Sequence, residues 1–419
     1  VERFFESGYE FSGYDDISTV PQEADGYVWW YQIPIRYEQN VLAEEIFEYT
    51  SKFEFVLSKI DSHKTFIALT MGILYNVPFT DDDSQLVKAV YDYKKCIRYM
   101  IFGNILKNNT YPLSVSSERI FQAIALAQYA RDVKADCIIH GSTGAGNDQV
   151  RFDLAFNVIC PEIEILTPVR DEKLTREFEI EYLKKEGIVS DWKKAEYSIN
   201  KGIWGTSIGG KETLHSSQTI PEYAYPSQCE KQDSRKIELE FDKGELVGMD
   251  GVLYQNPVDI IKKLNEIASQ YAIGRGMHIG DTIIGIKGRV AFEAAAPMVI
   301  IKAHHMLEKH NLTKWQLYWK EQLANFYGML LHEAQYQEPV MRNIEKYLED
   351  SQLHVTGKVF VELQPYNFIV IGIESKYDLM QAKFAQYGEV NTAFSGEDVK
   401  GFTKILSNQI KLYNSVCDK

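Results

Sequence analysis

The stretch that decides the fold is His140-Gly141-Ser142-Thr143-Gly144-Ala145-Gly146-Asn147-Asp148-Gln149-Val150-Arg151-Phe152-Asp153. A short apolar run, Cys137-Ile138-Ile139, precedes it and has the character of a buried strand. The residues from Val150 to Val158 read as a helix, with Asn147 or Asp148 as its N-cap. The sequence therefore predicts a strand, a glycine-rich loop and a helix, in that order.

This loop carries groups that suit an amino-acid ligand. Its glycines allow the backbone to approach a ligand closely, and the start of the helix offers free N–H groups to an anion. A hydroxyl, an amide, a carboxylate and a guanidinium come from four side chains: Thr143, Asn147, Asp148 and Arg151. Such a set gives donors to carboxylates and an acceptor to an ammonium group. A glycine pattern alone is equally typical of an ordinary turn between a strand and a helix.

The whole stretch resembles the aspartate- and citrulline-binding signature of argininosuccinate synthases, G-x-T-G-x-G-N-D-Q-x-R-F-[DE], and matches every fixed position. The resemblance covers residues 96–419. It implies an α/β nucleotide-binding domain with a parallel sheet, similar to adenine-nucleotide hydrolases, then an α+β synthetase and multimerisation domain and a C-terminal helix. The expected divisions are an atypical N-terminal segment at 1–92, the rest of the nucleotide-binding domain at 93–168, the synthetase domain at 169–395 and the oligomerisation helix at 396–419.

The composition narrows the class of protein. A chain of 419 residues is long enough for two or three domains. Its net charge of −14 argues against a nucleic-acid groove, since such grooves are usually basic. Five cysteines without a C-x-x-C pair favour a reducing compartment, and we expect a cytoplasmic protein. The longest apolar run, Phe66 to Tyr75, is too short to span a membrane.

The N-terminal segment departs from the family. Members carry an ATP-pyrophosphatase loop, S-G-G-x-D-[ST]-S, whose backbone N–H groups surround the phosphates. The nearest string is Phe11-Ser12-Gly13-Tyr14-Asp15-Asp16-Ile17-Ser18, which lacks the second glycine and follows no apolar strand. Tyr14 would place a large side chain where the phosphates need bare backbone. We therefore expect a chance similarity, and the sequence leaves open where the ATP phosphates bind.

Further elements follow from pattern and capping residues. Ser116 or Ser117 is expected to cap a helix, and Thr175 another. Asp250-Gly251 is a strong hairpin signal. The remaining predicted elements are strands at Glu162–Leu166, Thr282–Ile286, 355–363 and 366–373, and helices at Val41–Phe53, after Asn256-Pro257, at Glu293–His310, Thr313–Gln337 and Val399–Val416.

Two later stretches extend the resemblance. Tyr197 to Ile208 is the second family signature, and its Ser198 and Ser207 match two citrulline-binding serines. Gly285 to Glu293 resembles G-x-K-S-R-G-x-Y-E but departs from the pattern. Phe292 stands where the family has a tyrosine that faces citrulline. Gly280 stands where a glutamate is expected, and the neighbouring Asp281 could take over that carboxylate's role with a shifted backbone.

The resemblance assigns roles to residues of this chain. Aspartate is expected to contact Thr143, Asn147 and Asp148. Citrulline is expected to contact Tyr111, Ser116, Asn147, Arg151, Ser198 and Ser207. Gly141 is expected beside ATP, and no side chain stands out as a nucleophile. Without the resemblance, Ser116 would read as a plain N-cap and Tyr111 as a core aromatic.

The resemblance implies the ATP-dependent condensation of citrulline with aspartate through citrullyl-AMP, with Mg2+ on the phosphates. It also implies a homotetramer in which the C-terminal helix embraces neighbouring subunits. Two alternatives stay open from the sequence. One is a non-catalytic citrulline- and aspartate-binding homologue that has lost the pyrophosphatase loop, and the other is an unrelated adenylating ligase.

Overall fold

The computed structural model describes residues 66–69, 93–132, 134–144, 146–185, 197–385 and 393–417. Two predictions lie outside these residues: the phosphate-loop string at Phe11–Ser18 and the helix at Val41–Phe53. Within the described ranges, no helix is long and apolar enough to cross a membrane.

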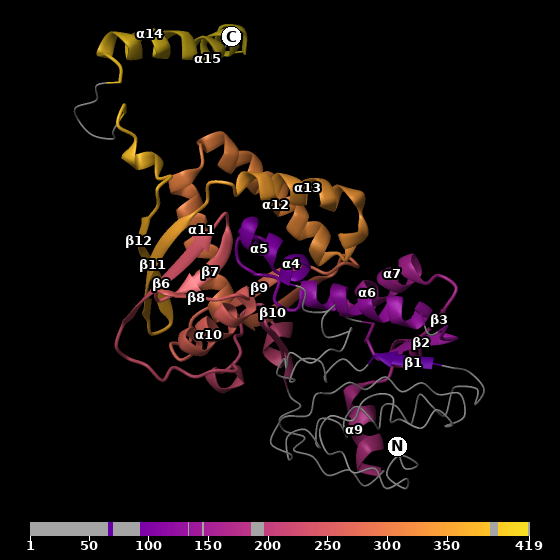
Figure 1. Ribbon diagram of the computed structural model, residues 1–419. Helices are drawn as coiled ribbons and strands as arrows, with labels where there is room; N and C mark the ends of the chain where they lie inside the picture. Colours follow the sequence, from indigo (N-terminus) through magenta and orange to yellow (C-terminus); the bar gives the residue numbers. More distant parts are fainter. Residues whose placement is uncertain are drawn as a thin grey trace.

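The first sheet is parallel. Strand β1 (Phe66–Leu69) pairs with β2 (Cys137–His140), and β2 pairs with β3 (Glu164–Leu166), in the order β1-β2-β3. Helices α6 (Ser116–Asp132) and α7 (Asp148–Ile159) lie beside this sheet (Figure 1). The alternation of strand and helix agrees with the predicted α/β arrangement, and the loop before α7 leaves the carboxyl end of the central strand.

A small core joins these elements. Ile138 on β2, Leu126 on α6 and Phe152 and Phe156 on α7 are all buried in one apolar cluster. The two phenylalanines are one helical turn apart, so they share the face that meets the sheet. Burying such a side chain stabilises a fold by roughly 1.5–3 kcal/mol. The packing of α7 therefore holds the start of the helix, and the loop before it, against the sheet.

The second sheet is antiparallel and carries part of the candidate site. Its order is β4 (Ser198–Gly202), β5 (Gly205–Gly209), β10 (Lys287–Glu293) and β9 (Arg275–Asp281). Strands β4 and β5 form a tight hairpin, although a stretch rich in serine, threonine and glycine reads as a loop from sequence.

The third sheet is a five-stranded antiparallel sheet. Its order is β12 (Asn367–Glu374), β11 (Gly357–Gln364), β6 (Arg235–Asp242), β7 (Glu245–Met249) and β8 (Val252–Leu253). The predicted β7–β8 and β11–β12 hairpins are both confirmed.

Helices pack around these sheets. The Thr175 hydroxyl accepts from the N–H of Phe178 at 3.2 Å, so this predicted cap is confirmed. Helix α6, however, begins at Ser116, so neither Ser116 nor Ser117 is its cap. The helix predicted after Asn256-Pro257 is present, and the Asn256 side chain accepts from the N–H of Val258 at 3.0 Å. The other helices are α4 (Tyr93–Cys96), α5 (Arg98–Phe102), α8 (Pro168–Asp171), α9 (Arg176–Lys185), α10 (Pro257–Ser269), α11 (Ala295–Asn311), α12 (Lys314–His332), α13 (Pro339–Ser351), α14 (Gly396–Leu406) and α15 (Asn408–Cys417).

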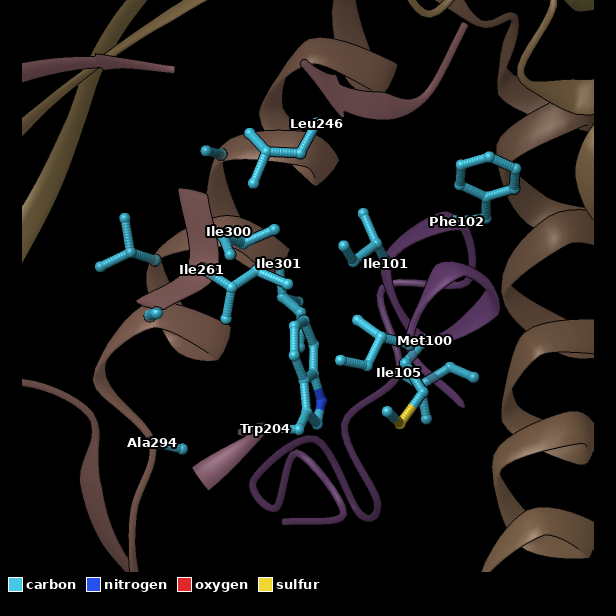
Figure 2. Close-up of a cluster of buried hydrophobic side chains, with 14 of the residues drawn as sticks. Met100, Ile101, Phe102, Ile105, Trp204, Leu246, Ile261, Ala294, Ile300 and Ile301 are labelled. Carbon is cyan, nitrogen blue, oxygen red and sulfur yellow. The ribbon is translucent and has the colours of Figure 1, made fainter. Parts of the chain in front are cut away.

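Trp204 joins the β4–β5 hairpin to the main core. Its indole is fully buried and lies among Met100, Ile105 and Ile301 (Figure 2). The same cluster contains residues of α10, α11, α12 and the five-stranded sheet. One aromatic ring thus anchors the tip of a polar hairpin in the largest apolar cluster of the described residues.

The predicted strand at Thr282–Ile286 is wrong, because these residues form the turn between β9 and β10. The Thr282 N–H donates to the Ile286 carbonyl at 2.8 Å, and the Gly285 N–H donates to the Thr282 carbonyl at 2.9 Å. Gly285 has φ +82, which an L side chain rarely adopts. The apolar pair Ile283-Ile284 gave a strand signal, but the glycine and the threonine bonds reverse the chain.

The predicted C-terminal helix is two helices, α14 and α15, which extend away from the rest of the described chain (Figure 1). They meet at Ser407, whose hydroxyl donates to the Lys404 carbonyl at 2.9 Å. Serine hydroxyls compete with the backbone for such carbonyls and interrupt helices. The apolar side chains of both helices are exposed, including Phe402, Ile405 and Leu412.

A buried ion pair connects three helices. The Lys320 ammonium on α12 lies 2.8 Å from the Glu308 carboxylate on α11, and neither side chain is exposed. The same ammonium donates to the carbonyl of Phe102, at the end of α5, at 2.7 Å. The Gln352 amide donates to the other oxygen of Glu308 at 2.8 Å. Burial raises the pKa of Glu308, but Lys320 and His304 outweigh it and hold the carboxyl ionised.

Lys320→Ala should therefore lower the free energy of unfolding by about 3–5 kcal/mol, because it leaves a buried carboxylate without its cation. Urea unfolding followed by tryptophan fluorescence measures the loss. Lys400→Ala, which removes an exposed pair with Glu397, is the control and should unfold like the unaltered protein. Equal midpoints for the two variants would contradict the prediction.

Candidate functional site

The glycine-rich loop is held in shape by its own helix. The Gln149 amide in the first turn of α7 donates to the carbonyls of Gly144 at 2.7 Å and Gly146 at 3.1 Å. Thr143 and Gly141, both exposed, lie on this loop. Asn147 is the N-cap of α7 by position, but its side-chain oxygen Oδ1 accepts from the N–H of Ile283 at 2.9 Å. This bond ties the loop to the β9–β10 turn.

His140 supports the loop from beneath. Its Nδ1 accepts from the backbone N–H of Ser142 at 3.4 Å, which leaves Nε2 to donate to Asp153 at 2.7 Å. Arg170 donates to the other oxygen of Asp153 at 2.7 Å. Burial raises the pKa of Asp153, but the bonds from His140 and Arg170 outweigh it and lower the pKa below its ordinary value. The loop that follows β2 is therefore supported by a hydrogen-bonded series of three side chains: His140, Asp153 and Arg170.

Asp148 is the centre of a cluster of charges. Its carboxylate accepts from Arg151 at 2.8 Å and from Arg119 of α6 at 3.2 Å. Burial raises the pKa of Asp148, but the two guanidinium groups outweigh it and lower the pKa below its ordinary value. The carboxylate therefore stays ionised at neutral pH and keeps acceptor capacity beyond its two arginines.

Arg151 connects this cluster to two further segments. Its guanidinium donates to the Ser116 hydroxyl at 3.2 Å and to the His332 carbonyl at 3.1 Å. The hydroxyl of Ser116 therefore takes part in the site instead of capping α6, which corrects the N-cap expectation. The arginine is itself buried, and its donors meet these two partners inside the protein.

Arg119 extends the cluster to the β4–β5 hairpin. Its guanidinium donates to the side-chain oxygen Oδ1 of Asn200 at 3.1 Å, and the side-chain Nδ2 of Asn200 donates to the Ser198 hydroxyl at 3.4 Å. In the strand register Asn200 lies opposite Ser207, and Ser207 lies opposite Phe292. Residues opposite each other, and residues two apart on one strand, point to the same face of a sheet.

One face of the antiparallel sheet therefore carries two of the six predicted citrulline contacts, Ser198 and Ser207, and Tyr111, a third, packs against that face. The Tyr111 ring stacks on His278 with centroids 5.1 Å apart and contacts Phe292 at 5.3 Å. His278 lies opposite Val290 on β10, two positions from Phe292, and so shares that face.

Asp281 does not replace the missing glutamate. The register puts Gly280 opposite Gly288 and Asp281 opposite Lys287. Asp281 therefore points to the other face of the sheet, where its exposed carboxylate lies 2.7 Å from the Lys287 ammonium. The expectation that Asp281 takes over that role is wrong, because the backbone alternation turns it away from Tyr111.

Glu118 holds the tip of the hairpin from α6. Its Oε1 accepts from the N–H of Trp204 at 3.0 Å, and a Cβ added to Gly202 would lie 2.0 Å from its Oε2. Within the described part of the chain, that Oε2 is buried without a hydrogen-bond partner. Burial raises the pKa of Glu118 to about 7, despite the Trp204 bond and the nearby Arg119.

Sequence reasoning missed Arg119, His332 and Asn200. Arg119 follows Ser116 by three positions, so both lie on one helix face, and that spacing could have pointed to it. Asn200 lies between Ser198 and Ser207 in the second signature, but its role needs the hairpin register. No sequence pattern points to His332, because it lies on α12, far along the chain from Arg151. Its backbone carbonyl and its ring contact Arg151 only in the folded protein.

The comparisons with known proteins agree with this arrangement. The model of the arginosuccinate synthase N-terminal HUP domain matches residues 82–189, and that of the arginosuccinate synthase C-terminal domain matches residues 197–413. The chain belongs to the argininosuccinate synthase family. The matches place the charge cluster and the hairpin in a family of ligases.

Curated relatives bear the name argininosuccinate synthase. One from Dictyoglomus thermophilum is 36% identical over 315 residues, which cover 75% of this chain and 79% of the relative. One from Pyrococcus furiosus is 38% identical over 320 residues, covering 75% and 77%. One from Sulfolobus acidocaldarius is 32% identical over 358 residues, covering 82% and 91%.

The stability of this family member should depend on pH through Glu118. The folded state holds the proton up to about pH 7, whereas an unfolded glutamate releases it near 4.5. The folded protein thus binds more protons in between, so its free energy of unfolding should fall as pH rises through this window, by on the order of 3 kcal/mol.

Urea unfolding of the unaltered protein and of Glu118→Gln, at pH values from about 5 to about 8, measures this contribution as the difference between the two curves. The glutamine keeps the acceptor for Trp204 but has no proton to lose. Parallel curves would contradict the shifted pKa.

Proposed function

We propose that this chain is an active argininosuccinate synthase, which condenses citrulline with aspartate using ATP and releases argininosuccinate, AMP and pyrophosphate. The observation that supports the proposal most is the bonded series Ser116–Arg151–Asp148–Arg119–Asn200. It joins the glycine-rich loop, the start of α6 and the β4–β5 hairpin, the three segments that the family uses for its amino-acid substrates.

The reaction has two steps. The ureido oxygen of citrulline bonds to the α-phosphorus of ATP, and the bond to pyrophosphate breaks. The aspartate amine then bonds to the ureido carbon, AMP leaves and the amine loses a proton. Since the substrates react directly with each other, the protein contributes position and charge stabilisation.

We assign aspartate to the loop. The ionised Asp148 carboxylate has acceptor capacity for the substrate ammonium, and the Thr143 hydroxyl and the Asn147 amide can donate to its carboxylates. Asp148 is only a quarter exposed, which strengthens such a contact relative to one in water.

We assign citrulline to the space between Tyr111 and the antiparallel sheet. Ser198 and Ser207 lie on the sheet face that Tyr111 covers, and Ser116 and Arg151 lie at the start of α6 and α7. Asn147 lies where the loop meets the β9–β10 turn, so it can touch both substrates.

We place ATP beside Gly141, at the carboxyl end of β2 in a domain similar to adenine-nucleotide hydrolases. Magnesium would bind the phosphates of ATP. Among the described residues, no group of three or more His, Cys, Asp or Glu side chains could hold a metal ion. We further propose a cytoplasmic homotetramer, because the widely spaced cysteines include no C-x-x-C pair and the apolar sides of α14 and α15 are exposed.

Isotope exchange between pyrophosphate and ATP tests the first step. We expect exchange that requires citrulline and does not require aspartate, and AMP release that requires both. Retained citrulline binding without any exchange would contradict the synthase proposal in favour of a non-catalytic binding protein.

Arg151→Lys should reduce kcat/KM for citrulline by about 100-fold, since a lysine cannot reach Ser116, Asp148 and the His332 carbonyl at once. Citrulline-dependent exchange at varied citrulline concentration measures the loss. Arg342→Lys, at a half-exposed arginine paired with Glu345 outside the site, is the matched control and should leave kcat/KM unchanged.

A further inference from the structure

No strand position of the sheet face that Tyr111 covers carries a carboxylate. These positions are taken by Ser198, Asn200, Gly202, Gly205, Ser207, Gly209, Gly276, His278, Gly280, Gly288, Val290 and Phe292. The Glu118 carboxylate meets this face at Gly202 on β4, the strand farthest from His278 on β9. Asp148, in the first turn of α7, meets the ammonium of aspartate under the proposed function. The ammonium group of citrulline therefore needs another acceptor, because a buried charge without a partner is strongly unfavourable.

His278 has the position for this role. Its ring is only 6% exposed and is held parallel to Tyr111, with an interplanar angle of 18°. A Cβ added to Gly280 would lie 2.7 Å from Nε2 of His278. The His278 imidazole thus occupies the space that a side chain at position 280 would fill. Its Nε2 is the ring atom nearest to where the Cβ of that side chain would be.

His278 also has the right chemistry. Burial, and then the charge of Lys107, lowers its pKa below the ordinary value, so the ring is neutral near pH 7. A neutral imidazole has one nitrogen that accepts hydrogen bonds. Asn200, on the opposite edge strand of this sheet, is already engaged, since its side-chain oxygen accepts from Arg119 and its side-chain NH2 donates to Ser198.

We propose that His278 accepts a hydrogen bond from the α-ammonium group of citrulline and so makes the site selective for an amino acid over an analogue that lacks the ammonium group. The imidazole takes the place of the glutamate that Gly280 has lost. This inference rests on the proposed function, because it concerns the substrate of the same site.

Binding calorimetry with citrulline and with 5-ureidopentanoate, which lacks only the α-ammonium group, tests it. The unaltered protein should bind citrulline about 10- to 100-fold more tightly than the analogue. His278→Phe keeps a ring for Tyr111 but removes the acceptor, so it should bind the two ligands equally. His278→Gln keeps an acceptor and should retain most of the preference.

The outcomes separate the two proposals. An unaltered protein that binds no citrulline would overturn the proposed function. An unaltered protein that binds citrulline but does not discriminate, or a His278→Phe variant that still discriminates, would overturn only the role of His278. If His278→Phe does not fold, NMR of the imidazole nitrogens in the unaltered protein tests the role of His278 instead. Citrulline should shift the His278 resonances, and 5-ureidopentanoate should not.

Discussion

The bond between Asp148 and its two arginines is the interaction on which the site depends. One carboxylate in the first turn of α7 receives Arg151 from its own helix and Arg119 from α6. Each arginine then reaches a segment that is distant in sequence, the α12 terminus or the β4–β5 hairpin. Without a common anion, two buried guanidinium groups would repel each other, and the segments would lose the charge that draws them together.

The hairpin is held from both sides, and this keeps its face toward the site. Arg119 binds Asn200 in its first strand, and Glu118, the neighbour of Arg119 on α6, binds the backbone at its tip. Trp204 places the same tip in the main apolar core (Figure 2). A polar strand pair of this kind has little apolar surface of its own, so these anchors replace the packing that usually sets a strand's face.

The strand register explains how the chain departs from the family pattern at Gly280. Gly280 and His278 share a face, and the ring of one fills the space left by the absent side chain of the other. Asp281 is nearer in sequence to the lost glutamate but lies on the opposite face. In a strand, a shift of one residue reverses the face, whereas a shift of two preserves it.

The sequence by itself determined the local elements and the chemistry of the loop. Glycines, capping residues and alternating apolar residues act over a few positions, so the strand–loop–helix unit, the Thr175 cap and the hairpin at Asp250-Gly251 could all be predicted. The strand prediction at Thr282–Ile286 was wrong because Ile283-Ile284 favour a strand whereas Gly285 favours a turn. Only the tertiary structure decided which side chains meet. Helix packing and strand register bring Arg119 to Asn200 and Tyr111 to His278. Both depend on contacts between residues far apart in the chain and leave no local pattern.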